Sequence, residues 1–175
     1  MKRPVQTPDG YGPVQIALHW AIAGMVLLQL LLSGPIQVAF DARMDGGSPI
    51  HGFLGGALAT AHLVVGSSIL VLAVWRLALR LTRGAPPASM PAPRVIVLIG
   101  KVAHLLLYGF IFLMPVTGLV AWFFQSDLAA GLHGWLRWPF ILLVVGHGVG
   151  ALVEHMVFRN RTLERMLRAG PPEEG

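Results

Sequence analysis

Two histidines, fourteen residues apart, lie in or beside one long apolar segment of the chain. His133 precedes the apolar run 135–153 and His147 interrupts it. At about 100° per residue, fourteen residues make nearly four helical turns, so both imidazoles leave the same helix face, roughly 21 Å apart along the axis. A polar ring is costly in hydrocarbon and is rarely placed there without a partner. The spacing therefore favours two cofactor sites, one near each end of this segment.

The composition is typical of an integral membrane protein. The 175 residues are 55% hydrophobic and only 12% charged, and the mean hydropathy is +0.68. A soluble domain would carry about twice that charged fraction. Four apolar stretches each reach or exceed the roughly 20 residues needed to span hydrocarbon. We predict one membrane domain over residues 1–175, with helices over about 14–33, 53–80, 95–124 and 132–158.

The connections indicate how these helices are arranged. The sequence Ser33-Gly34-Pro35 is expected to end the first helix, and an outer loop is expected over 35–49. The third connection is short, near residues 125–131, and short connections join antiparallel neighbours. The predicted fold is therefore all-α, an antiparallel four-helix transmembrane bundle.

Basic residues lie mostly on one side of the predicted membrane. Eleven of the thirteen Lys and Arg residues precede the first span, surround the connection between the second and third spans, or follow the fourth; Arg43 and Arg137 are the exceptions. The positive-inside rule then places both termini in the cytoplasm. Because the charges flank spans and have no aromatic-rich soluble module beside them, nucleic-acid binding is not expected.

Depth within the spans sorts four histidines into two layers. His19 lies near the cytoplasmic start of the first span and His147 in the inner half of the fourth, so the two can share an inner layer. His62 lies in the outer half of the second span and His133 at the outer end of the fourth, so these can share an outer layer. Depth alone would match His62 with His147 almost as well. However, His19 cannot reach the outer layer, so it needs an inner partner.

The other three histidines are weaker candidates. His104 starts the third span at the cytoplasmic side, and we interpret it as interfacial or close to a quinone. His51 lies in the outer loop or at the edge of the second span, on the same helix face as His62, and it is the main rival for a role in the outer layer. His155 is expected to be interfacial, within reach of the headgroups.

Two histidines per layer suit a haem iron. Cysteine is absent, which excludes thiolate ligands and covalent attachment through Cys-x-x-Cys-His. A four-ligand zinc or copper site would gather its imidazoles at one depth. Two imidazoles on opposite sides of a haem leave no open position at the iron, which favours electron transfer over oxygen binding. The sequence thus predicts two b haems, and Gly66, one turn after His62, would leave room for a flat macrocycle.

Short motifs in all four spans resemble those of one known family. They are Leu18-His19-Trp20 in the first span, His62-x-x-x-Gly66 and Trp75-Arg76 in the second, His104-x-x-x-Tyr108 and Met114-Pro115-Val116-Thr117-Gly118 in the third, and His133 and His147 followed by Ala151-Leu152-x-x-His155 in the fourth. Their order and spacing are similar to those of the prokaryotic cytochrome b561 family, which are small di-haem membrane cytochromes. The resemblance covers nearly the whole chain.

This resemblance implies His19 with His147 as the ligands of the inner haem, and His62 with His133 as those of the outer haem. It also implies a bacterial inner-membrane protein that exchanges electrons with ubiquinone. One family member is a superoxide oxidase that takes electrons from periplasmic superoxide, so a superoxide:ubiquinone oxidoreductase is one expectation here. The alternative is a haem-bearing membrane anchor that passes electrons for a partner redox enzyme. The expected partners are lipid, quinone and a periplasmic redox partner.

Three arginines are candidates for contacts with haem propionates. Arg76 and Arg80 lie on one helical face at the cytoplasmic side, where they would pair with propionates or with anionic headgroups. Arg137, one turn after His133, is the better candidate for an outer propionate, because basic groups are scarce on that side. Arg43 and Arg137 could also supply the positive potential that steers an anion such as superoxide.

Overall fold

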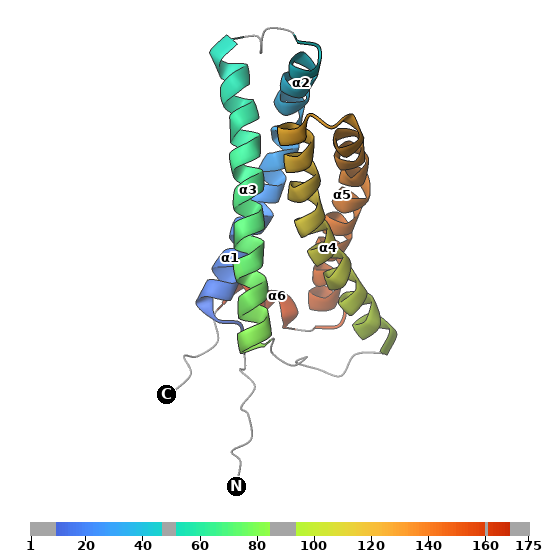
Figure 1. The fold of residues 1–175 in the computed structure, drawn as a ribbon. Coiled ribbons are helices and arrows are strands. Elements are labelled where there is room, and N and C mark those ends of the chain that lie inside the picture. The colour runs from blue at the N-terminus through green and yellow to red at the C-terminus, as the bar shows by residue number, and fades with distance from the viewer. Residues whose placement is uncertain (1–9, 47–51, 85–93, 160, 169–175) are drawn as a thin grey trace.

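Four long helices account for most of the molecule. The computed structural model describes residues 10–46, 52–84, 94–159 and 161–168. Its elements are α1 (Pro13–Leu31), α2 (Ser33–Met44), α3 (Gly52–Arg83), α4 (Arg94–Phe124), α5 (Asp127–Met156) and α6 (Thr162–Leu167). Helices α1, α3, α4 and α5 are long and apolar enough to cross a membrane, and successive ones run in opposite directions (Figure 1). The predicted all-α, four-helix membrane bundle is confirmed.

The outer segment after α1 differs from the prediction. The sequence predicts a helix end near residues 33–35 and then a loop, but α1 ends at Leu31, and α2 begins after the single residue Leu32. A proline is tolerated in the first turn of a helix, because the N–H groups there have no intrahelical acceptor. Pro35 therefore lies in the first turn of a new helix, which packs on α3 at the same end of the bundle as the α4–α5 turn (Figure 1).

The turn between α4 and α5 is shorter than the sequence suggests. Only Gln125 and Ser126 separate the two helices, and Gln125 reverses the chain with a φ of 50°. Ser126 caps α5, since its Oγ accepts a hydrogen bond from the Ala129 N–H at 3.3 Å, and Asp127 complements the helix dipole in the first turn. As a result His133 lies in the second turn of α5 rather than at its edge.

The helices pack closely in some pairs and more loosely in others. Helix α4 packs mainly on α5, α1 mainly on α3, and α3 also contacts α4. Within the described residues, neither α1 with α5 nor α3 with α5 is among the closely packed helix pairs. Side chains of α5 that meet those of α1 or α3 must therefore reach across a wider separation between the helices.

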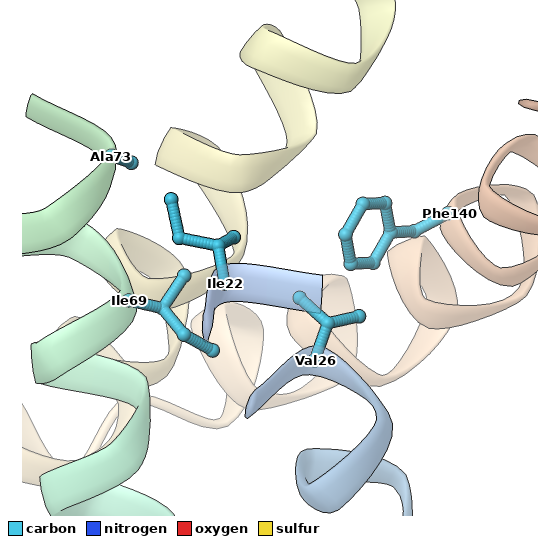
Figure 2. Packing of buried hydrophobic residues seen from close by; sticks show 5 residues of the cluster. All are labelled: Ile22, Val26, Ile69, Ala73 and Phe140. Carbon is cyan, nitrogen blue, oxygen red and sulfur yellow. The ribbon is translucent and has the colours of Figure 1, made fainter. Parts of the chain in front are cut away.

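A small apolar cluster fills the middle of the bundle, as Figure 2 shows. Its buried members are Ile22 and Val26 of α1, Ile69 and Ala73 of α3, and Phe140 of α5. Phe140 also stacks on Phe110 of α4, with the ring centroids 5.6 Å apart. In α5, Phe140 lies midway in sequence between His133 and His147. The cluster thus separates the two histidine layers.

Candidate functional site

The structure brings the two histidines of the outer layer together. His62 of α3 and His133 of α5 face each other with their ring centroids 6.3 Å apart and their planes at 74°. Both line a largely apolar pocket to which helices α1 to α5 all contribute. His51, the predicted rival, lies outside the described residues.

The inner layer forms a second pair with the same ring separation. His19 of α1 and His147 of α5 have centroids 6.3 Å apart and planes at 70°. The neighbouring Trp20 lies edge-on to His19 at 5.2 Å, and its indole N–H donates to the Met166 carbonyl at 2.7 Å. This bond ties α6 to the turn of α1 that carries His19.

The geometry of both pairs fits one metal ion held between two imidazoles. A metal bonded at about 2.0 Å to one nitrogen of each ring would hold the ring centroids roughly 6 Å apart. Each pair also joins α5 to a helix that does not pack closely on it, which is α1 for the inner pair and α3 for the outer pair. Among the described residues, no three His, Cys, Asp or Glu side chains gather in a way that could hold a metal. Two protein ligands per site suit a metal whose other ligands come from a macrocycle.

His133 is held by a cradle on α4. Its Nδ1 donates to the Met114 carbonyl at 2.9 Å and lies 3.2 Å from Thr117 Oγ1. A carbonyl only accepts, so Nδ1 carries the proton and Nε2 keeps its lone pair for a metal. A Cβ at Gly118 would lie 3.1 Å from His133 Cε1, so the glycine lets α4 approach the ring closely. In the sequence, residues 114–118 were noticed only as a family motif. The hydrogen bond to Met114 could not be predicted, because every residue type has a backbone carbonyl.

His62 is contacted by α1 through a glutamine that the sequence did not single out. Gln29 Nε2 donates to the His62 carbonyl at 3.0 Å. A Cβ at Gly66 would lie 2.8 Å from the same Nε2, closer than atoms can pack. The space at Gly66 is therefore filled by the Gln29 amide, whereas the sequence suggested that it would make room for a macrocycle.

Buried polar atoms without a hydrogen-bond partner concentrate around the two layers. Within the described part of the chain they are Gln29 Oε1, His62 Nδ1, Arg76 Nη1, Tyr108 Oη and Arg137 Nε. Gln29, His62 and Arg137 line the outer pocket. Arg76 and Tyr108 belong to the inner half of the bundle, where the Arg80 guanidinium lies over the Tyr108 ring at 5.9 Å. Buried donors are rarely left unpaired in native proteins, so a bound group with acceptor atoms would satisfy Arg76 and Arg137.

A third histidine lies against the inner pair. The His104 ring is 5.1 Å from the His147 ring, and its Nδ1 donates to the Gly100 carbonyl at 2.6 Å. His104 is thus closer to the inner layer than an interfacial position would suggest. His155 is exposed.

The two arginines of the outer side lie on tryptophans. Arg43 of α2 lies over the Trp122 ring at 5.2 Å, and Arg137 lies over the Trp138 ring at 5.0 Å. Trp122 and Arg137 both line the outer pocket, so the Arg43 contact links α2 to the pocket wall. The positive charge of the outer side is therefore placed at the edge of the outer layer.

Comparison with known proteins agrees with this architecture. The family model of prokaryotic cytochrome b561 matches residues 10–169. Cytochrome b562 of Cereibacter sphaeroides is 34% identical over 160 residues, which cover 91% of this chain and 96% of that protein. Cytochrome b561 homolog 2 of Escherichia coli K12 is 27% identical over 97% of each chain. The resemblance inferred from the four motifs is confirmed: the chain belongs to the prokaryotic cytochrome b561 family and is a multi-pass bacterial membrane haem protein.

Proposed function

We propose that this protein is a di-haem b-type cytochrome that carries electrons across the bacterial inner membrane. Electrons would pass between a periplasmic donor, with superoxide as the candidate, and the ubiquinone pool, with both termini in the cytoplasm. The observation that carries the proposal is the repeated histidine pair, twice at a ring separation of 6.3 Å. The two members on α5 are fourteen residues apart, or roughly 21 Å along the helix. That spacing supports two cofactors in one short relay.

His19 and His147 would be the axial ligands of the inner haem, and His62 and His133 those of the outer haem. A haem held by two imidazoles supplies reversible one-electron chemistry at an iron with no open position. The His133 Nδ1–H bond to the Met114 carbonyl supports this assignment, since metal-binding histidines usually donate their other ring N–H in this way. The apolar cluster around Phe140 lies between the two layers.

Three arginines would hold the haem propionates. Arg137 Nε is buried at the outer pocket and has no partner among the described residues, so a carboxylate there would satisfy it. Arg76 Nη1 is in the same position in the inner half, and Arg80 lies beside it on α3. A buried guanidinium nitrogen without an acceptor is costly, which favours propionates over headgroups as the partners of Arg76 and Arg137.

The outer surface supports an anionic electron donor. Arg43 lies at the edge of the outer pocket on Trp122, where its charge would raise the local concentration of superoxide. Arg137, once paired with a propionate, would add little to this potential. Two superoxide anions would each give up one electron and leave as dioxygen. The two electrons, with two protons from the cytoplasmic side, would reduce one ubiquinone to ubiquinol.

Haem analysis and stopped-flow spectroscopy test the proposal. Pyridine haemochrome assay of the purified protein should give two b haems per chain. Anaerobic mixing with superoxide and, separately, with ubiquinol shows which compound reduces the haems quickly. We expect fast reduction by superoxide and reoxidation by ubiquinone. Reduction by ubiquinol alone would reverse the direction of flow, and a single haem per chain would contradict the two-layer assignment. Reduction only by a co-purifying periplasmic subunit would instead identify a membrane anchor.

A further inference from the structure

Gln29 stands out as the polar side chain of α1 that lies inside the outer pocket and reaches a histidine on another helix. It is half-buried and faces His62 across the α1–α3 contact. An amide inside a membrane bundle is costly unless it forms hydrogen bonds, so we expect the Gln29 side chain to have polar partners there.

The contact is specific on both sides. Gln29 Nε2 donates to the His62 carbonyl at 3.0 Å, although that carbonyl already lies within a helical ladder. The approach is possible only because position 66 is glycine, since a Cβ there would come within 2.8 Å of Nε2. Gln29 on α1 and Gly66 on α3 are therefore sterically complementary, and their contact lies beside His62.

The remaining polar atoms of the two residues are complementary. Gln29 Oε1 is a buried acceptor and His62 Nδ1 is a buried ring nitrogen, and neither has a partner in the described part of the chain. When Nε2 of a histidine binds a metal, Nδ1 carries a proton and needs an acceptor. The outer partner His133 already has its acceptor in the Met114 carbonyl, whereas the His62 ring lies near the Leu32 backbone but makes no hydrogen bond through Nδ1.

We propose that Gln29 is a positioning residue for the outer haem: its amide N–H fixes the α3 backbone at His62, and its carbonyl oxygen accepts the Nδ1–H of that ligand. Gly66 acts through Gln29 by leaving space for the amide. This inference rests on the proposed function, because it takes His62 as an axial ligand.

Substitution at position 29 separates this role from simple packing. Gln29→Met keeps the size and removes both hydrogen bonds, which makes His62 a weaker base. We expect the midpoint potential of one haem to rise, the other to stay unchanged, and haem transfer to excess apomyoglobin to become about tenfold faster. Gln29→Glu keeps an acceptor and adds negative charge, so the same potential should fall. A packing role would shift both variants in one direction, which would overturn the proposal.

A double-mutant cycle tests the link to Gly66. Gly66→Ala should displace the amide and raise the same potential, but it should add little in a Gln29→Met background. Additive effects would overturn the proposal, as would unchanged potentials and transfer rates in Gln29→Met. Gln37→Leu is the matched control, because Gln37 also lines the pocket but is exposed and bonded to Asp41 within α2.

His62→Ala keeps the two levels of inference apart. If this variant retains both haems, the proposed ligand set fails. If it loses one haem while Gln29→Met behaves as wild type, only the role of Gln29 fails.

Discussion

The two histidine layers use the same side chains at the same ring separation, yet their surroundings differ. The outer pair lies in a largely apolar pocket that α2 helps to line, and the His133 ring donates a hydrogen bond to a backbone carbonyl. The inner pair has a third imidazole, that of His104, next to His147. Two arginines of α3, Arg76 and Arg80, lie in the same half of the bundle. Since second-shell hydrogen bonds and nearby charge tune a haem, one scaffold can hold two haems of different potential.

Removing a single histidine ligand should have the largest effect, because one of the two layers should lose its haem. We expect His62→Ala and His133→Ala to leave one haem per chain with one common absorption spectrum, and His19→Ala and His147→Ala to leave one haem with another. The two histidines of a pair bind the same haem, so both should be required to retain that haem. Pyridine haemochrome assay and low-temperature spectra check this. The pairing is wrong if His19→Ala resembles His133→Ala, and His155→Ala should keep both haems.

The apolar cluster between the two histidine layers should contribute strongly to the free energy of unfolding. Phe140 is 8% exposed, belongs to the central cluster and stacks on Phe110. Phe140→Ala should lower the free energy of unfolding by about 3 kcal/mol, because it leaves a cavity that the helices cannot close. Unfolding in mixed micelles would measure this. Phe124→Ala, at a position 78% exposed, is the control and should change little.

A methyl group added at Gly118 should change the midpoint potential of the outer haem and leave that of the inner haem unchanged. In Gly118→Ala, the new Cβ would lie 3.1 Å from His133 Cε1, so the ring must move by a few tenths of an ångström. We expect a packing cost on the order of 1 kcal/mol. The midpoint potential of the outer haem alone should shift, because a displaced ring changes its bond to the iron unequally in the two oxidation states. Spectroelectrochemical titration measures both midpoints. Gly109→Ala meets nothing within 4 Å and should leave both unchanged; an equal shift of both haems in Gly118→Ala would contradict the local cradle.

The smallest effect is expected at α6. Arg161 donates to both carboxylate oxygens of Glu164, at 2.9 and 3.1 Å, and this lowers the pKa of Glu164. A lowered folded-state pKa contributes stability above the unfolded pKa and loses it as the pH falls through the folded value. Because Arg161 is exposed and Glu164 is only partly buried, Glu164→Gln should lower the melting temperature only slightly at pH 7 and even less at pH 3. A shifted inner-haem potential would show that α6 contributes to that layer.

Much of the architecture could be predicted from residue types and spacing. The apolar lengths predicted four spans, and the depths of His19, His62, His133 and His147 predicted the two pairs that the structure brings together. The start of α2 was missed because a proline signals both the end and the beginning of a helix, and only packing on α3 selects between them.

Other site features could not be predicted, since they depend on contacts between helices. The sequence contains Gln29, Gly66 and Gly118, but no local pattern says that the first two meet or that the third faces His133. The closeness of His104 to His147 depends in the same way on how α4 lies against α5.

The sequence by itself determined that the chain enters the membrane as four helices and carries histidines at two depths, because hydrocarbon thickness fixes helix length and helical periodicity fixes which residues share a face. Only the tertiary structure decided which atoms surround each imidazole. Hydrogen bonds and close contacts are set within a few tenths of an ångström, and that precision arises only when separate helices pack together.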